Sequence, residues 1–541
     1  MTKTVLRRVL SACALAAALS VVLPAAEAAP KLVVLIVIDQ MRADYVDRFH
    51  DDWSAGLRRL VDEGAWFTNV NYPYLDTVTC AGHATVSTGA FPHTHGIEGN
   101  TWFDRTRPQP AVIPCTDDQR ARVVSYGKEA ASRTGPANLM IPSLAEQMRG
   151  NGSKVVTLAL KARSAIMLAG HSGDAVTWIS ESLDGWETST SFAAQPVPEV
   201  KAFVAANPLD ADFAKTWDRL LPVSKYTEAD AGLGEDPTKG WTSTFPHVLN
   251  GANGRVDTSY YDQWQHSPFA DAYVARMAGA LAESMKLGTG THTDFLGVSF
   301  SSPDLVGHAF GPNSQEIRDM YAHLDRSIGT LLTTLDRLVG PGQYVVALSA
   351  DHGVTPIPEQ LRKSGRDAGR LSGSRILNAG ENTAVRAMGE GKYLSRLNGI
   401  DIYFEPGMYD KAKRHKALKG IIGAMAKEPG VARIFTADEL ANGATSKDRE
   451  LRAAALSYVP GRSGDLILSP KPGWMFSAAG TTHGSATADD QHVPILLFGY
   501  GVKPGKYTTA ATPADVAPTL ATLTGTALPN AEGKALKEAL R

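Results

Sequence analysis

Short apolar runs recur along the chain and predict the strands of a buried sheet. The clearest is residues 31–38 (KLVVLIVI), which are apolar and β-branched almost throughout, without polar alternation. Such a run is typical of a strand covered on both faces in a parallel sheet. Further strands are predicted at residues 154–160, 293–300, 344–350 and 493–500.

Helical periodicity occupies the intervals between these strands. Residues 54–64, 271–287 and 313–338 carry apolar positions three and four apart, as on the buried face of an amphipathic helix. Helices are also predicted at residues 139–148 and 513–525. The alternation of strands and helices predicts an α/β fold, a mostly parallel sheet with helices on both faces.

Two stretches show weaker patterns and are interpreted as inserted cap or lid regions. Five of the nine tryptophans lie between residues 171 and 266, among Gly, Pro and polar residues, so a lid or substrate-facing insertion is expected at about 171–268. Residues 356–480 show only weak strand signals, at 401–404 and 465–469, and are expected to form a second insertion. One domain is therefore expected over residues 30–541.

The first 29 residues have the pattern of a secretory signal peptide. Lys3, Arg7 and Arg8 precede an apolar run at 9–23, and small residues near Ala28 suit cleavage. The sequence around Cys13 resembles a lipoprotein box, but the apolar run follows that cysteine, so lipidation is not expected. No later window is long and apolar enough for a membrane span. We expect a periplasmic or secreted bacterial protein without a membrane anchor.

Charge and cysteine content narrow the possible functions. The mature chain would carry 51 basic and 55 acidic residues, and this balance argues against a nucleic-acid platform. Its two cysteines are Cys80 and Cys115. In an oxidising compartment they form either one disulfide or two buried free thiols, and the sequence leaves both open.

Chemically useful side chains follow four of the predicted strands, where open α/β sheets bind ligands. These residues are Asp39, the pair Lys161 and Arg163, the pair Asp304 and His308, and the pair Asp351 and His352. Taken singly, an aspartate after a strand often caps a helix, and paired cations are often solvated surface charge. It is a poor explanation that all four strand ends carry such residues by coincidence, so a ligand-binding site is predicted there.

The spacing within each pair points to its chemistry. Asp304 and His308 are four apart, so one helical turn brings them to the same face, and carboxylate with imidazole is a common zinc pairing. Asp351 and His352 can share a metal if the chain turns sharply, which Gly353 permits. In extended structure Lys161 and Arg163 would point to the same side, a pairing that suits a multiply charged oxyanion.

Residues 76–89 (DTVTCAGHATVSTG) predict a short helix with a threonine at its start. Thr79 would then face the positive end of the helix dipole, a place that suits a nucleophile and a phosphate, although Thr77 or Thr79 could simply cap the helix. Asn100 is a candidate donor to an oxyanion. His93 and His95 lie among turn residues in a loop and are interpreted as structural, or as residues that support the metal ligands, rather than as ligands themselves.

Together these motifs resemble the alkaline phosphatase superfamily, and within it the secreted bacterial phosphatases of the PhoK/PafA type. The resemblance runs from about Lys31 to the end and is carried by Asp39, TVTCAGH, Asn100, the Lys-Ala-Arg triplet and the segments PDLVGH, ADHG and TTHGS. It implies an alkaline-phosphatase-like core that acts as a monomer on small phosphate monoesters over a broad range.

The resemblance also implies the roles of the residues. Thr79 would be the nucleophile and form a phosphothreonine, and Asn100, Lys161 and Arg163 would hold the non-bridging phosphate oxygens. Two zinc ions would be bound, one by Asp304, His308 and His483, the other by Asp39, Asp351 and His352 with Thr79. A structural calcium is left open.

Three alternatives are weighed beside this reading. A phosphodiesterase or nucleotide pyrophosphatase of the same superfamily would share the two-metal core, with Lys161 and Arg163 pointing away. A sulfatase is disfavoured because Cys80 is not followed by the Pro and Arg of the sulfatase motif. A non-catalytic zinc- or phosphate-binding protein is disfavoured by the intact nucleophile beside a complete ligand set.

Overall fold

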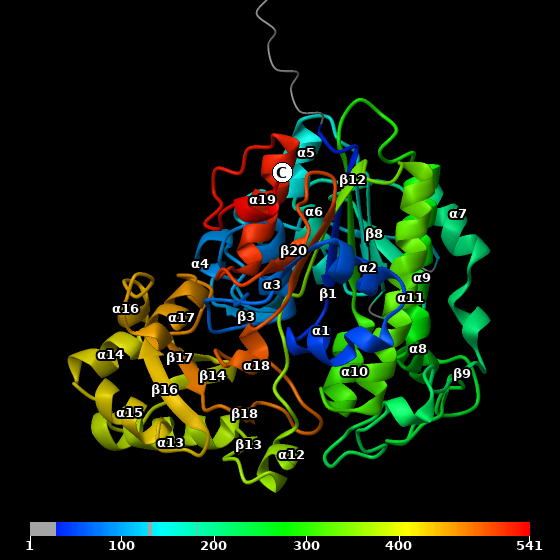
Figure 1. The fold of residues 1–541 in the computed structure, drawn as a ribbon. Coiled ribbons are helices and arrows are strands. Elements are labelled where there is room, and N and C mark those ends of the chain that lie inside the picture. The colour runs from blue at the N-terminus through cyan, green and yellow to red at the C-terminus, as the bar shows by residue number, and fades with distance from the viewer. Residues whose placement is uncertain (1–28, 128–131, 181) are drawn as a thin grey trace, which may run out of the picture.

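A ten-stranded sheet runs through the middle of the protein (Figure 1). The structure, a computed structural model, describes residues 29–127, 132–180 and 182–541. The strands lie in the order β20 (Gly505–Tyr507), β2 (Ala65–Phe67), β19 (Ile495–Gly499), β12 (Tyr344–Ser349), β1 (Leu32–Ile38), β11 (Asp294–Phe300), β6 (Val155–Ala159), β7 (Ala175–Ile179), β8 (Trp186–Ser189) and β5 (Val123–Ser125).

The middle of this sheet, from β12 to β7, is parallel, and antiparallel pairs flank it. The register brings the carboxyl ends of the central strands together: Ile38 lies opposite Phe300, and Val37 lies opposite Ser349. Whatever follows these strands therefore meets at one edge of the sheet.

Helices cover both faces of the sheet, as Figure 1 shows. One layer contains α2 (Gly56–Glu63), α9 (Pro268–Ser284) and α11 (Gln315–Leu338); the other contains α3 (Thr79–Thr88), α5 (Leu144–Gly150), α6 (Ala162–Ala169) and α19 (Val516–Thr524). At the carboxyl edge lie α1 (Asp44–Phe49), α10 (Ser302–Phe310) and α18 (Ala488–Gln491).

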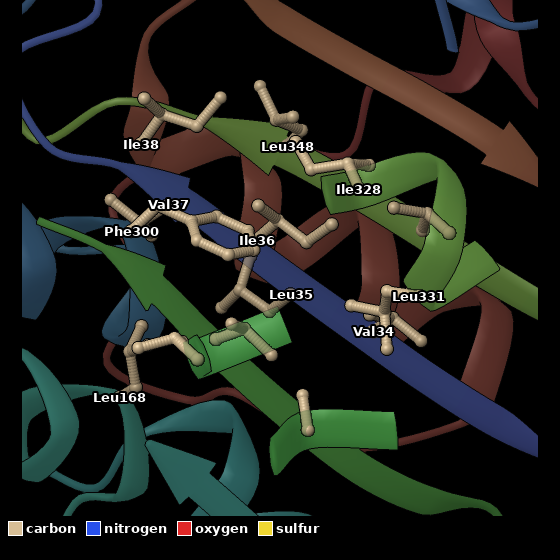
Figure 2. Packing of buried hydrophobic residues seen from close by; sticks show 14 of the residues in the cluster. Val34, Leu35, Ile36, Val37, Ile38, Leu168, Phe300, Ile328, Leu331 and Leu348 are labelled. Atoms are coloured by element: carbon tan, nitrogen blue, oxygen red, sulfur yellow. The ribbon is translucent and has the colours of Figure 1, made fainter. Parts of the chain in front are cut away.

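The main core forms where β1 is packed between these layers. Val34 lies beside Leu331 of α11, and Leu168 of α6 lies near β11, the strand that neighbours β1 (Figure 2). Every residue of β1 is fully buried. Burial on both faces explains why this strand is apolar without alternation.

A smaller unit with its own apolar core lies beside the main sheet, at the lower left of Figure 1. Its four-stranded antiparallel sheet has the order β14 (Leu394–Asn398), β15 (Asp401–Phe404), β17 (Leu466–Pro470) and β16 (Val431–Thr436). Helices α13 (Gly373–Met388), α14 (Met408–Arg414) and α15 (Leu418–Met425) accompany it. Ile402, Ile421 and Leu468 are among the buried residues of this core.

Short elements complete the fold. The two-stranded pairs are β3 (Thr101–Asp104) with β4 (Ala111–Pro114), β9 (Thr216–Trp217) with β10 (His247–Val248), and β13 (Gly369–Arg370) with β18 (Trp474–Met475). The remaining α-helices are α4 (Pro92–His95), α7 (Pro198–Ala206), α8 (Thr258–Gln265), α12 (Pro358–Lys363), α16 (Ala437–Leu440) and α17 (Arg449–Ser457).

The five predicted strands are all present, and the α/β class is confirmed. The helix predicted at 139–148 instead begins at Leu144, because the Ser143 side chain accepts from the Glu146 amide and caps it there. Residues 175–179 and 186–189, within the range expected to be inserted, form β7 and β8 of the main sheet.

Apart from Ala29, the predicted signal peptide lies outside the described residues. Among the described helices, none is long and apolar enough to cross a membrane.

Candidate active site

Side chains from the ends of four neighbouring strands converge at the carboxyl edge of the sheet. Asp39 follows β1, Lys161 follows β6, Asp304 lies in the first turn of α10 after β11, and Asp351 follows β12. The strand order β12, β1, β11, β6 makes these positions neighbours. The parallel sheet thus assembles the residues that the sequence pattern singled out.

Among the described residues, two groups of three side chains have the geometry to hold a metal ion. One consists of Asp304, His308 and His483, and the other consists of Asp39, Asp351 and His352. Within each group the potential ligand atoms lie within 4.8 Å of one another. The groups adjoin, because the rings of His352 and His483 stack with their centroids 3.5 Å apart.

The backbone fixes the orientation of all three histidines. Nδ1 of His308 donates to Thr481 O at 2.8 Å, and Nδ1 of His483 donates to Thr77 O at 2.7 Å. Nδ1 of His352 donates to Gly353 O at 2.9 Å. A histidine whose Nδ1 carries the proton presents the lone pair of Nε2, and metal-binding histidines are commonly held in this way.

Buried carboxylate oxygens indicate that this site fits cations. Asp39 Oδ1 and Asp351 Oδ2 are buried and accept no hydrogen bond of good geometry from the described residues. The nitrogens nearest to them belong to histidines: Nε2 of His352 lies 3.4 Å from Asp39 Oδ1, and Nδ1 of His83 lies 3.1 Å from Asp351 Oδ2. A buried carboxylate oxygen normally has a partner, since leaving it unpaired is costly. The nitrogen and oxygen donors suit zinc, although manganese and iron accept the same donors.

The pKa values at the site reflect burial and mutual charge. Burial lowers the pKa of His352, but the carboxylates of Asp351 and Asp39 outweigh it and bring that pKa to about 9. Burial together with His352 and His308 holds the pKa of His483 well below its usual range. Burial and Asp39 raise the pKa of Asp351. These groups are electrostatically linked, so each depends on the charge of its neighbours.

Thr79 occupies the first position of α3 and is buried beside these groups. Its Oγ1 lies 3.5 Å from Nε2 of His352, and Val78, in extended conformation, precedes it as the N-cap residue. Gly82, one turn later, lets the helix pack against Asp351, since a Cβ there would lie 2.1 Å from the Asp351 carbonyl oxygen. The predicted placement of Thr79 at the helix start is confirmed.

Asn100 is tied to the same helix end. Its Oδ1 accepts from the Cys80 amide at 2.8 Å, so its side-chain NH₂ is left to donate elsewhere. Cys80 forms a disulfide with Cys115, whose amide donates to Asn100 O at 2.9 Å. Of the two states left open by the sequence, the structure therefore has the disulfide.

Of the two residues predicted to lie in extended structure, Lys161 has an extended backbone and Arg163 does not. Helix α6 begins at Ala162, so Lys161 is its N-cap residue and Arg163 belongs to its first turn. The Lys161 ammonium lies 2.6 Å from Asp39 Oδ2 and 2.5 Å from Asp304 Oδ2, joining one carboxylate from each group. Arg163 forms no ion pair with any described residue, and its buried Nε lacks a partner.

Comparison with known proteins agrees with this geometry. A family model described as type I phosphodiesterase / nucleotide pyrophosphatase matches residues 33–492. Alkaline phosphatase PhoV of Synechococcus elongatus is 32% identical over 538 residues, covering 96% of this chain and 94% of PhoV. Alkaline phosphatase PafA of Elizabethkingia meningoseptica is 30% identical over 535 residues, covering 94% of each chain. The chain belongs to the type I phosphodiesterase / nucleotide pyrophosphatase family, and within it to the alkaline phosphatases of the PafA and PhoV type.

Solved structures support the same assignment. The crystal structure of wild-type PafA matches this alkaline phosphatase with a TM-score of 0.86 and 29% identity, over 95% of this chain and 99% of PafA. A murine ectonucleotide pyrophosphatase/phosphodiesterase matches with a TM-score of 0.54 and 13% identity, which shows the fold alone. The predicted superfamily, fold and enzyme class are thus confirmed.

Two residues support the site of this phosphatase but were given no role by sequence reasoning. Gln40 has a positive φ of 70°. Its backbone N–H donates to Asp351 Oδ1, and its side-chain Nε2 donates to Asp304 Oδ1 at 2.6 Å. His83 Nδ1 lies 2.9 Å from Thr79 O, and its Nε2 lies 2.8 Å from Ser299 Oγ. The sequence held one signal for each residue. His83 lies inside the TVTCAGH motif, and Gln40 directly follows Asp39, a predicted metal ligand.

His93 and His95 lie in the short helix α4 and not among turn residues as the sequence predicted, but their contacts are structural, as expected. His95 is fully buried, lies 3.1 Å from Thr85 Oγ1 and accepts from the Ile97 amide. His93 pairs with Glu532 at 2.7 Å. Neither belongs to a described group that could hold a metal.

Proposed function

We propose that this alkaline phosphatase hydrolyses phosphate monoesters over a broad range through a phosphothreonine on Thr79. The observation that carries the proposal is the position of the Thr79 hydroxyl. It lies at the start of α3, 3.5 Å from Nε2 of His352 in one candidate metal group. The Asn100 side chain accepts a hydrogen bond from the backbone amide of Cys80, the next residue of the helix. A hydroxyl, a helix N-terminus and an amide donor around one point suit a phosphoryl group under attack.

The residues that would hold two zinc ions follow from the two groups. Asp39, Asp351 and His352 would hold one together with Thr79, and Asp304, His308 and His483 would hold the other. When bound, such ions favour ionisation of the attacking hydroxyl and stabilise charge on the leaving oxygen. The buried oxygens of Asp39 and Asp351 that accept no hydrogen bond of good geometry support this fit.

The chain's own residues account for the rest of the reaction. Thr79 gives its hydroxyl proton to solvent and its Oγ1 bonds to phosphorus, while the bond from phosphorus to the leaving oxygen breaks. The leaving oxygen takes a proton from solvent and departs as the alcohol. A water molecule then attacks the phosphothreonine, and the bond from phosphorus to Thr79 Oγ1 breaks. The products are an alcohol and inorganic phosphate, and Thr79 regains its proton.

Lys161 and Arg163 support a monoester as the substrate. A monoester dianion carries one more negative charge than a diester, so it gains more from nearby cations. Arg163 has no carboxylate partner among the described residues, which leaves its guanidinium for phosphate oxygens. A phosphodiesterase activity is the second candidate, because the matching family model is described by that activity.

We also propose that residues 1–29 direct export and that the mature enzyme acts in the periplasm or outside the cell. The basic start, the apolar run and the small residues near Ala28 support this. The Cys80–Cys115 disulfide is in keeping with an oxidising compartment.

Replacing Thr79 by alanine tests the nucleophile. We expect Thr79→Ala to lower steady turnover of phenyl phosphate by roughly three orders of magnitude or more, because the covalent route is lost. Acid quenching of the wild type with ³²P-labelled substrate should trap label on the protein, and peptide mapping should find it on Thr79. The variant should remain unlabelled while its zinc content, measured by mass spectrometry, stays near two per chain.

Two further variants serve as controls. Thr79→Ser keeps a hydroxyl and should retain measurable turnover and labelling. Thr88→Ala removes a hydroxyl from the other end of α3, where it donates to Ala84 O, and should leave labelling intact. If Thr79→Ala kept most of the activity or still became labelled, Thr79 would not be the nucleophile.

A further inference from the structure

A cavity of about 210 Å³ adjoins the candidate active site. It shares Asn100 and His483 with that site, and residues 398–401 and 474–476 form much of its far side. These far residues belong to the smaller unit and to the chain that follows β17. None of them has a role in the phosphoryl transfer described above.

Part of the cavity wall is apolar and held in place. Ile400, Trp474 and Phe476 line it. The Trp474 indole N–H donates to Asp367 at 3.1 Å, and its ring lies so close to Gly430 that a Cβ there would be 2.3 Å from it. A fixed aromatic ring beside an aliphatic side chain is a common surface for an apolar ligand group.

Another part of the wall carries three carboxyl groups and neither lysine nor arginine among its described residues. Asp76, Asp401 and Asp490 line the cavity, and no lysine or arginine is among its described lining residues. In the described part of the chain, none of these three carboxylates forms an ion pair with lysine or arginine. Asp401 accepts from the Gly464 amide at 2.5 Å, and Asp490 accepts from Ser485 and Thr355, so two of the three are fixed by neutral donors.

We propose that this cavity receives the leaving group of the ester and selects alcohols that carry a ring or a small apolar group and no second anion. This rests on the proposed function. In an in-line transfer the leaving oxygen faces away from Thr79, toward the group that contains His483. Because His483 also lines the cavity, the remainder of the alcohol continues into it.

Size and charge then define the preferred alcohols. The volume suits a single substituted ring. Burial raises the pKa of Asp401 to about 7 and that of Asp490 to about 6, so both carry negative charge at alkaline pH. Neutral and cationic alcohols are accepted there, whereas a carboxylate or a second phosphate on the alcohol meets two carboxylates that pair with no described lysine or arginine.

Three aryl phosphates of similar size test the charge preference. Their para substituents are trimethylammonio, tert-butyl and carboxylate, of which the first two have the same shape and differ in charge. Each kcat/KM for a variant is divided by the wild-type value, so that intrinsic reactivity cancels. We expect Asp401→Asn to raise kcat/KM for the carboxylate ester, relative to the tert-butyl ester, by about three- to tenfold and to lower it for the cationic ester.

Asp410→Asn is the matched control, because it removes one negative charge from an exposed position on α14. It should leave all three ratios unchanged. If Asp401→Asn also left them unchanged while turnover continued, the cavity would not be the leaving-group site. If zinc-loaded wild type turned over none of the three esters, the proposed function would fail and this inference with it.

A second variant tests the apolar wall without relying on Asp401. Trp474 is partly exposed, and Trp474→Ala should raise the inhibition constant of the unreactive phenylphosphonate about fivefold, the scale of one aromatic contact. The inhibition constant of inorganic phosphate, which has no leaving group, should stay the same. Equal changes for the two inhibitors would overturn the inference.

Discussion

Two neighbouring cations, Lys161 and Arg163, have different surroundings within the active site. Lys161 lies between Asp39 and Asp304, so its charge is already engaged by one carboxylate of each metal group. Arg163 has no such partner among the described residues. A change at Lys161 therefore disturbs the metal ligands as well as any phosphate contact, whereas a change at Arg163 isolates the phosphate contact.

Arg163→Ala should reduce monoester hydrolysis more than diester hydrolysis. We expect kcat/KM for an aryl phosphate monoester to fall roughly 10- to 100-fold, the scale of a lost charge-assisted contact, and kcat/KM for the matching methyl aryl diester to fall less than fivefold. The second charge of the monoester is the reason for the difference. Steady-state kinetics on both esters, with zinc-loaded protein, measures the ratio.

Arg366→Ala provides the control, since Arg366 is exposed and lies outside the site. It should change neither rate. An equal loss on both esters in Arg163→Ala would remove the argument for a monoesterase from this residue. A greater loss on the diester would favour the phosphodiesterase alternative.

For single residues, the sequence could indicate the metal ligands but not the residues that hold those ligands in place. Asp39, Asp351 and His352 follow apolar strands, and the parallel sheet brings strand ends together, so their convergence was predictable. Gln40 has no such pattern: its role depends on a positive φ that aims its amide at Asp351 and its side chain at Asp304. Such a conformation arises from tertiary contacts and leaves no periodic signal.

Helix α3 is the element on which the proposed chemistry depends, and it is anchored by its first turn. Cys80 joins it to Cys115, just beyond β4, and the Cys80 amide also holds the Asn100 side chain. The Cys115 amide holds the Asn100 carbonyl. The disulfide therefore keeps the start of the helix and the Asn100 donor at a fixed separation.

Removing both cysteines should lower stability and slow turnover. The bridge closes a loop of 35 residues in sequence separation, for which loop entropy gives about 3–4 kcal/mol. For Cys80→Ala with Cys115→Ala we expect a Tm about 5 °C lower and a kcat reduced several-fold, as Asn100 loses its fixed position. Thermal melts and kinetics on the zinc-loaded protein measure both.

A thiol assay and a single variant complete that test. Denatured mature wild type should show no free thiol without reductant, and Cys115→Ala alone should show one. That single variant should melt close to the double variant, because one cysteine cannot form the bridge. A double variant as stable as the wild type would mean that the bridge contributes nothing.

The elements were predicted best where both faces are buried and worst where the chain changes conformation. Residues 31–38 read as a central strand because every position is covered. The expected alignment of Lys161 and Arg163 failed because α6 begins at Ala162, three positions after the last residue of β6, Ala159. Residues two apart point to the same side of a strand but to different sides of a helix. The residue at which a strand gives way to a helix depends on packing.

On the scale of the whole molecule, the two candidate metal groups connect distant parts of the chain. Their ligands come from positions 39, 304, 308, 351, 352 and 483, so they link the ends of β1 and β12, helix α10 and the loop before α18. Three carboxylates converge there, with Lys161 between two of them. Bound cations would relieve that repulsion in the folded state, and an unfolded chain could not reproduce the arrangement.

Zinc should therefore stabilise the folded protein as a whole. Any ligand that binds only the folded state adds RT ln(1 + [L]/Kd), which is about 4 kcal/mol at a thousandfold excess over Kd. We expect chelator-treated wild type to melt several degrees lower and to regain its Tm when zinc is restored. His483→Ala removes a ligand and should lose much of that increment.

His492→Ala separates this effect from the general cost of losing a histidine. His492 Nδ1 donates to Val70 O and does not belong to either metal group, so its removal should lower Tm with and without zinc by similar amounts. The zinc-dependent increment should then stay at the wild-type value. Equal Tm values for chelated and zinc-loaded wild type would mean that the converging carboxylates are balanced within the protein itself, with Lys161 as the main counter-charge. In that case the two groups would not be zinc sites.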